Sequence, residues 1–128
     1  MSDMDEFRNL IRTLRGESGC PWDKKQTLKT LVKYVKDEAA EVAEAVESGD
    51  DAAVCEELGD VLLIVTMMAQ VAEEEGRFGF DDCVRSISEK IVRRHPHIFK
   101  NKEDLTEQEI IANWHQIKES EKRGKAGG

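Results

Sequence analysis

Two pairs of acidic residues, three positions apart within each pair, are the strongest chemical signal in the sequence. Glu38 and Glu41 form the first pair, and Glu57 and Asp60 form the second. Residues three apart occupy neighbouring parts of one helix face, so two antiparallel helices would bring all four carboxylates together. Carboxylate oxygens suit Mg²⁺ or Mn²⁺, whereas Zn²⁺ favours Cys or His. The spacing therefore predicts a magnesium site, with manganese as the alternative ion.

These acids interrupt apolar stripes, which distinguishes them from ordinary surface charges. Glu38 lies three residues after Val35 and four before Val42. Glu57 takes the equivalent place in the stripe of the next helical segment. A charge on a core-facing stripe is costly unless it is paired or binds a metal ion. The competing interpretation is that the four acids are helix-surface charges or partners of lysines, but two such pairs on consecutive helices favour the metal site.

The periodicity of the apolar residues predicts five helices and no strand, so the expected fold class is all-α, a helical bundle. We expect helices over residues 4–15, 27–48 and 51–75, from Asp81 or Asp82 to Pro96, and from Thr106 onward. Gly49 is expected to end the second helix, and a tight turn over residues 48–50 joins it to the third. Residues 16–23, GESGCPWD, are expected to form a loop because Gly and Pro interrupt helices.

The chain of 128 residues suits one domain, which we place at residues 1–122. Residues 123–128 contain no apolar side chain apart from one alanine, so we expect a disordered tail there. The segment 61–72, VLLIVTMMAQVA, is apolar on nearly every side. One short domain can hardly surround such a helix. The sequence therefore predicts a homodimer or a dimer of dimers.

The charge and the cysteine content indicate which binding partners and which cellular compartment to expect. The formal net charge of -8 argues against binding to nucleic acid or to an anionic membrane surface. Cys20, Cys55 and Cys83 are odd in number and show no CxxC spacing, which is typical of reduced thiols in a cytoplasmic protein. Cys55 and Cys83 fall within helical patterns, where we expect them to be buried.

A second group of residues could hold a nucleotide. Lys90 and Arg94 are four apart near the end of the fourth helix and could clamp a phosphate chain. The alternative is a basic helix end that complements the helix dipole. Trp114 and Lys118 are also four apart, so that Trp114 could stack on a base while Lys118 meets a phosphate. Equally, Trp114 could pack in the core beside apolar residues of its own helix.

Taken together, these motifs resemble the MazG nucleoside triphosphate pyrophosphohydrolases, within the all-α NTP pyrophosphatase group. The resemblance extends over about residues 5–120. The matching segments are GCPWDKKQT (19–27), DEAAE (37–41), EELGDVLL (56–63), EEGRFGF (74–80), KIVRRHPHIF (90–99) and NWHQIK (113–118). The resemblance implies a dimer of bundled helices of this fold type.

The family pattern is E-E-x-x-E followed by E-x-x-D. Its metal ligands match Glu38, Glu41, Glu57 and Asp60, whereas the first acid of the pattern is Asp37 here. The resemblance also implies that Lys90 and Arg94 contact phosphates and that Trp114 and Lys118 lie at the nucleotide.

We therefore expect a Mg²⁺-dependent enzyme that hydrolyses an NTP or dNTP between the α and β phosphates. The products would be a nucleoside monophosphate and pyrophosphate, and the role would be removal of noncanonical or surplus nucleotides. Glu38 or Glu41 would accept the proton of the attacking water, and spacing does not choose between them. The alternatives are a helical dimer that binds nucleotide and metal with little turnover, and a phosphoribosyl-ATP pyrophosphohydrolase. The GCPWD and RRHPHIF segments point away from the latter.

Overall fold

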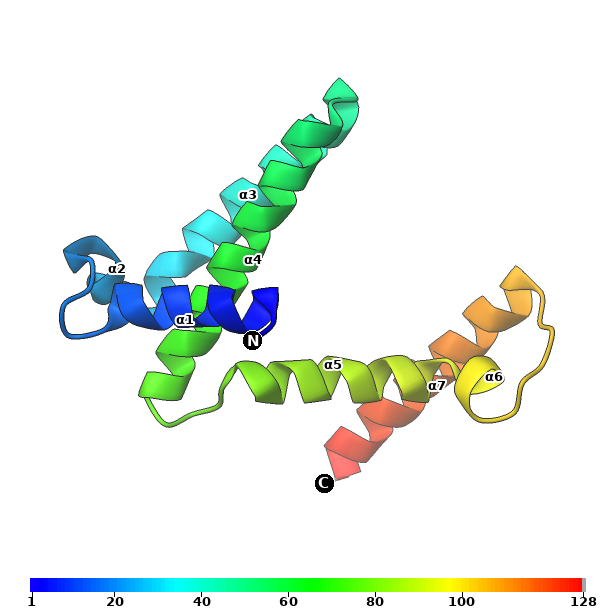
Figure 1. Ribbon diagram of the computed structural model, residues 1–128. Helices are drawn as coiled ribbons and strands as arrows, with labels where there is room; N and C mark the ends of the chain where they lie inside the picture. Colours follow the sequence, from blue (N-terminus) through cyan, green and yellow to red (C-terminus); the bar gives the residue numbers. More distant parts are fainter. Residues whose placement is uncertain (128) are drawn as a thin grey trace. The chain divides into compact units, whose positions relative to one another are not determined.

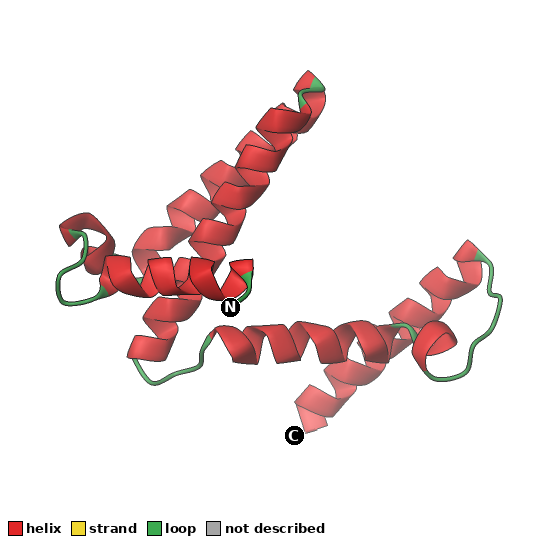
Figure 2. Ribbon diagram, in the orientation of Figure 1, coloured by secondary structure: helices red, strands yellow, loops and turns green. Residues whose placement is uncertain are grey.

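The computed structural model describes residues 1–127, together with the side chains of residues 1–125, and contains helices and loops only within that range (Figures 1 and 2). The helices are α1 (Asp3–Arg15), α2 (Pro21–Lys25), α3 (Leu28–Ser48), α4 (Asp51–Glu74), α5 (Phe80–Arg94), α6 (Pro96–Phe99) and α7 (Glu107–Gly127). The predicted all-α fold class is therefore confirmed. None of these helices combines the length and apolarity needed to cross a membrane.

The two short helices α2 and α6 were not predicted. Each begins with a proline at its first turn, where the missing N–H costs no hydrogen bond. The expected loop over residues 16–23 is thus wrong from Pro21 onward. Gly19 permits the tight approach before α2, because a Cβ there would collide with the Leu14 carbonyl, to which the Cys20 N–H donates at 2.8 Å.

The chain divides into two compact units, residues 1–83 and residues 84–128. The single domain over residues 1–122 stays a prediction. The helix α7 includes residues 123–127 of the segment for which we predicted disorder, and residue 128 lies outside the described residues.

The first unit is built on a hairpin of α3 and α4, which lie side by side (Figure 1). Thr27 caps α3, and its hydroxyl accepts from the Thr30 N–H at 3.1 Å. Gly49 ends the helix with φ of 74°, a conformation that favours glycine. The Asp50 carboxylate then caps α4 by accepting from the Ala52 N–H at 3.0 Å. These local signals confirm the predicted turn, and α3 and α4 pack against each other on either side of it.

The core of this unit lies at the end of the hairpin away from that turn, where α1 packs on α4. Its buried residues are Ile11, Leu31, Met67 and Val71, with Phe7, Leu14, Leu28, Tyr34, Leu63 and Met68 packed around them. Arg15 links α1 to the end of α4 and to α2 with the residue that follows it. Its Nε and Nη2 donate to the Glu74 carboxylate at 2.8 and 2.9 Å, while Nη1 donates to carbonyls of Asp23 and Gln26.

In the second unit, Thr106 and Glu109 form the predicted capping box of α7. The Thr106 N–H donates to Glu109 Oε1 at 3.1 Å, and the Glu109 N–H donates to Thr106 Oγ1 at 3.2 Å. The start of α5, up to Cys83, lies in the first unit and differs from the prediction. The helix begins at Phe80, because Asp82 lies inside its first turn and accepts from the Gly79 N–H at 2.8 Å instead of preceding the helix.

All three cysteines are free thiols. Cys55 and Cys83 are exposed, so the prediction that both are buried is wrong. Their side chains lie on the outward sides of their helices, whereas the buried positions of α4 are concentrated between Thr66 and Ala72.

Candidate functional site

The hairpin brings together the four predicted acids. Glu38 and Glu41 come from the middle of α3, and Glu57 and Asp60 come from the facing part of α4. One carboxylate oxygen of each residue lies within 4.8 Å of the corresponding oxygens of the other three. This spacing follows from two i, i+3 pairs on antiparallel helices. The four carboxylates therefore converge on one small volume.

Burial makes this cluster unusual. Glu38, Glu57 and Asp60 are half-buried, and Glu41 is exposed. One oxygen of Glu38 and one oxygen of Glu57 are buried and have no hydrogen-bond partner. Among the residues that the structure describes, no lysine or arginine forms an ion pair with any of the four. The interpretation of these acids as partners of lysines therefore has no support in the geometry.

The proximity of the four acids changes their titration. Burial raises the pKa of the Glu57 carboxyl from its ordinary 4.5 to about 7, and the neighbouring Glu38 and Glu41 carboxyls add to the rise. Burial also raises the pKa of Glu38, with the charges of Glu41 and Asp60 acting in the same direction. Near neutral pH the cluster thus retains a proton that offsets its mutual repulsion.

The chemistry of these residues fits a divalent cation. The cluster offers oxygen ligands only, with no His or Cys among the group. Hard oxygen ligands suit Mg²⁺ and Mn²⁺, and a bound ion would satisfy the buried oxygens that lack partners. Binding requires ionised carboxylates, so it would displace the retained proton.

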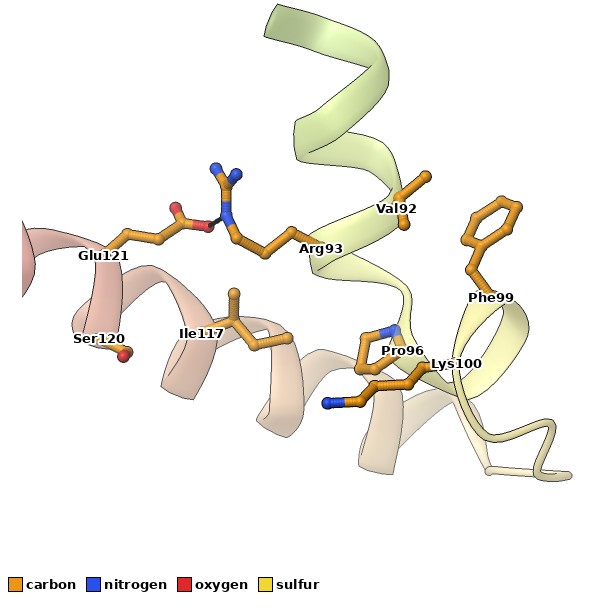
Figure 3. A pocket seen from close by; sticks show the side chains of 8 residues that line it. All are labelled: Val92, Arg93, Pro96, Phe99, Lys100, Ile117, Ser120 and Glu121. Carbon is orange, nitrogen blue, oxygen red and sulfur yellow. Dashed lines mark hydrogen bonds and ion pairs between the residues drawn. The ribbon is translucent and has the colours of Figure 1, made fainter.

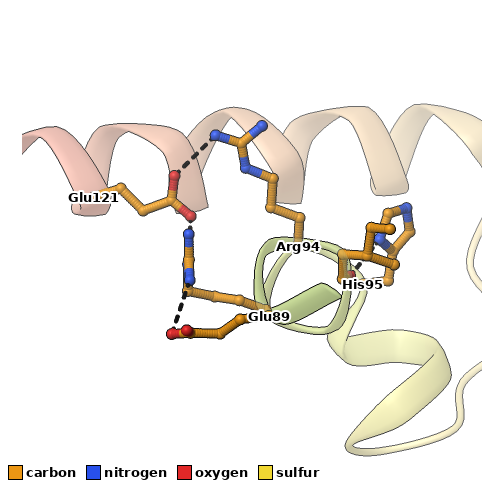
Figure 4. Close-up of polar contacts among 6 residues, drawn as sticks. Glu89, Arg94, His95 and Glu121 are labelled. Atoms are coloured by element: carbon orange, nitrogen blue, oxygen red, sulfur yellow. Dashed lines mark hydrogen bonds and ion pairs between the residues drawn. The ribbon is translucent and has the colours of Figure 1, made fainter. Parts of the chain in front are cut away.

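The predicted phosphate-binding residues lie in the second unit. Lys90 and Arg94 are half-buried near the end of α5. Arg94 Nη2 donates to Glu121 Oε1 of α7 at 2.9 Å (Figure 4). Arg93 Nε donates to the other oxygen of the same carboxylate at 2.6 Å (Figure 3). The end of α5 is therefore more than a solvated basic terminus, since two of its cations hold one carboxylate of α7.

Trp114 and Lys118 lie together on α7, as their spacing predicts. Lys118 Nζ lies 4.4 Å from the centre of the Trp114 ring, and Arg94 Cζ lies 5.8 Å from it. Trp114 is 36% exposed, so part of its ring is accessible, and the choice between stacking on a base and packing beside its own helix stays a prediction. An accessible aromatic ring bordered by cations is suited to a base that carries phosphates.

Comparison with known proteins now decides the family. Residues 26–99 match the MazG nucleotide pyrophosphohydrolase domain. The chain belongs to the MazG family. The matched range includes the four acids, Lys90 and Arg94, and it ends before Trp114 and Lys118.

Two similar proteins extend the match along almost the whole chain. The nucleoside triphosphate pyrophosphohydrolase of Escherichia coli (strain K12) is 42% identical over 127 residues, which cover 98% of this chain and 48% of that protein. The uncharacterized protein YabN of Bacillus subtilis (strain 168) is 50% identical over 120 residues, which cover 94% of this chain and 24% of YabN. The chain therefore spans less than half the length of these two curated relatives.

A solved structure supports the fold as well. The crystal structure of a mazG-related protein from Thermotoga maritima is 32% identical and has a TM-score of 0.76. The alignment covers 90% of this chain and 98% of that one. The helical fold is therefore that of a MazG-related protein.

Two residues refine the site beyond the predicted set. Asp37, which stands where the MazG pattern has its first glutamate, is exposed and lies outside the group of converging carboxylates. Glu121 was missed by the sequence analysis, although it follows Trp114 by seven residues and Lys118 by three on the same helix. That spacing places all three on one face of α7. The missing information was the position of Arg93 and Arg94 on another helix.

We expect Glu57→Gln to remove a pH-dependent part of the folding stability of the metal-free protein. The pKa of Glu57 is about 7 in the folded protein against an ordinary value of 4.5, so the folded state binds this proton more tightly than the unfolded chain. The resulting stabilisation is complete below the ordinary pKa and is lost as the pH rises through about 7. Urea denaturation in EDTA across this window should therefore show wild type losing stability relative to Glu57→Gln.

The matched control is Glu44→Gln, which removes an exposed carboxylate from α3. The difference in unfolding free energy between Glu44→Gln and wild type should not change with pH as the difference for Glu57→Gln does. A difference between wild type and Glu57→Gln that stays constant through this pH range would contradict the raised pKa.

Proposed function

We propose that this chain is a Mg²⁺-dependent nucleoside triphosphate pyrophosphohydrolase that cleaves NTPs or dNTPs between the α and β phosphates. The observation that carries the proposal is the convergence of four carboxylates, two of which have a buried oxygen without a partner. Membership of the MazG family gives this cluster a reaction class. Mn²⁺ is the alternative ion, because it accepts the same oxygen ligands.

Mg²⁺ bound by these residues would offset phosphate charge and make a water molecule easier to deprotonate. Glu38, Glu41, Glu57 and Asp60 would hold the ion. We assign the proton acceptor to Glu41 ahead of Glu38, because the Glu41 side chain is exposed whereas one oxygen of Glu38 is buried. A proton acceptor must reach the attacking water, so access counts together with basicity.

The nucleotide contacts are assigned to the second unit. Lys90 and Arg94 would bind phosphates, Trp114 would stack on the base, and Lys118 would meet a phosphate beside it. The Lys118 ammonium already lies over the Trp114 ring, so a base on that ring would have a cation close to its phosphates. The biological role in this proposal is removal of noncanonical or surplus nucleotides from the cytoplasmic pool.

We further propose that the chain works as a homodimer or a dimer of dimers. Leu58, Leu62 and Val65 follow one another at helical spacing on α4 and are 50%, 47% and 43% exposed. An apolar stripe on the outside of the central hairpin is typical of a surface that another subunit covers. The opposite side of the same helix carries the buried residues Met67 and Val71, so α4 would be enclosed on both sides.

The first test is identification of the products. With Mg²⁺ and a panel of NTPs and dNTPs, we expect a nucleoside monophosphate and pyrophosphate, with no orthophosphate as a first product. Glu57→Ala should abolish turnover and retain the helical circular dichroism spectrum, because it removes a ligand and relieves repulsion. Glu44→Ala should keep wild-type turnover. Orthophosphate with a diphosphate, or full activity of Glu57→Ala, would refute the proposal.

The second test concerns Trp114. If the base stacks equally well in the ground state and in the transition state, loss of that stacking raises KM and leaves kcat unchanged. Because stacking on a base is worth roughly 1–3 kcal/mol, we expect Trp114→Ala to raise KM about tenfold. Trp114→Phe keeps an aromatic face and should restore most of the affinity. An unchanged KM with lowered thermal stability would instead make Trp114 a packing residue.

The third test is the mass in solution. Light scattering at micromolar concentration should give twice or four times the mass of one chain. Leu62→Lys should lower that mass, because it places a charge within the apolar stripe. Glu73→Lys, at an exposed position of the same helix, should leave it unchanged. A wild-type protein with the mass of a single chain would contradict the assembly.

A further inference from the structure

Glu121 holds the two arginines at the end of α5 in one shared interaction. Its Oε2 accepts from Arg93 Nε at 2.6 Å, and its Oε1 accepts from Arg94 Nη2 at 2.9 Å. The side chains of Glu121 and Arg94 are only 18% and 17% exposed, whereas Arg93 is 43% exposed. The hydrogen bond from Arg94, followed by that from Arg93, lowers the pKa of Glu121 to about 2. Glu121 is therefore a permanently ionised carboxylate at neutral pH.

Glu121 does not use all the hydrogen-bond donors and positive charge of the cations around it. Arg94 Nε is buried and has no hydrogen-bond partner. Lys118 contributes a further positive charge over the Trp114 ring, on the helix that carries Glu121. Arg93 has a second, longer contact, from Nη1 to Glu89 at 3.4 Å (Figure 4 shows Glu89 beside this group). The group thus keeps donors and charge that an incoming anion could use.

A carboxylate and a phosphate make the same demand on an arginine. Both present paired oxygens that accept charge-assisted hydrogen bonds from the guanidinium fork. A phosphate that binds Arg94 through its fork must therefore share or replace Glu121. We propose that Glu121 is an internal counter-anion that competes with nucleotide phosphates for Arg93 and Arg94 and thereby sets the affinity of this site. The inference rests on the proposed role of Arg94 in phosphate binding.

The surroundings give Glu121 room to leave. A cavity of about 560 Å³ adjoins the Arg93–Glu121 pair (Figure 3). Its walls are largely apolar, with Val92, Phe99 and Ile117 among them, and Lys100 adds a cation. Lys100 forms no ion pair within the part of the chain that the structure describes. A displaced carboxylate would therefore meet open space and a free positive charge.

Competition has a clear functional consequence. An ion with a single phosphate only replaces the Glu121 carboxylate at the arginine guanidinium groups, so its net gain in binding free energy is small. A triphosphate makes the same replacement and also contacts other cations. The cost of displacing Glu121 does not cancel these additional contacts. The internal carboxylate would therefore keep small anions, including free orthophosphate, from occupying the site.

The experiment compares wild type, Glu121→Gln and the control Glu119→Gln. Gln keeps the shape of Glu121 and one oxygen acceptor, so it can still accept from one of the two arginines, while the competing charge and the second acceptor are removed. Glu119 is an exposed acid on the same helix whose ion pair is with Lys122 at 3.9 Å, so its replacement removes equal charge without touching the arginines. Each protein is titrated in EDTA with inorganic tripolyphosphate and with ATP, by calorimetry and by proton–nitrogen NMR of the arginine Nε–H groups.

We expect Glu121→Gln to bind both probes about tenfold more tightly than wild type, the effect of losing one close charge interaction of about 1.4 kcal/mol. Glu119→Gln should bind as wild type does. In wild type, tripolyphosphate should shift the Arg93 Nε–H signal as its acceptor changes from carboxylate to phosphate. The melting temperature of each variant shows whether it is folded, and the wild-type NMR result stands even if Glu121→Gln is not.

Three distinguishable results would overturn the inference. Equal or weaker binding by folded Glu121→Gln, with normal binding by the other two proteins, would make Glu121 a positioning residue and leave the proposed function intact. Absence of binding by all three proteins would contradict the phosphate role of the second unit itself. An Arg93 Nε–H signal that stays fixed at saturating tripolyphosphate would show that Glu121 is not displaced.

Discussion

The mutual repulsion of four carboxylates is the constraint on which the first unit depends. Glu38, Glu41, Glu57 and Asp60 would separate in a flexible chain, yet their oxygens lie within 4.8 Å of one another. Only a rigid backbone can hold them there, because partial burial adds a desolvation cost to the repulsion. The hairpin supplies that rigidity, and its capped helices leave few ways for the acids to move apart.

Stability and chemistry are consequently placed at different points along the same hairpin. The buried cluster around Leu31 and Met67 lies towards the end where α1 packs, and the bidentate Arg15–Glu74 pair ties that end together. The carboxylates lie nearer the Gly49 turn, where the remaining side chains are more exposed. Apolar burial in one part of a helix pair thus compensates for charge concentrated in another part.

The sequence could predict the acid cluster because helical periodicity is local information. Spacing of three within Glu38–Glu41 and within Glu57–Asp60, together with Gly49 between the helices, determines which side chains meet. The α7 capping box at Thr106 was predictable for the same reason. The contacts of Glu121 and Arg15 could not be predicted from the sequence, because each residue joins helices whose packing no local pattern specifies. The prolines at the starts of α2 and α6 explain why these two helices were not predicted, because a proline interrupts a helix but is equally compatible with its first turn.

The two units meet the cost of like charge in different ways. In the first, burial and the neighbouring carboxyls raise the pKa of Glu57 to about 7, so the folded cluster binds a proton more tightly than the unfolded chain does. In the second, Arg93 and Arg94 are neutralised in part by the carboxylate of Glu121. Each arrangement offsets like charge as a ligand of opposite charge would, a cation at the acids or an anion at the arginines. A divalent cation at the acids would replace the proton, and a phosphate at the arginines would replace the internal carboxylate.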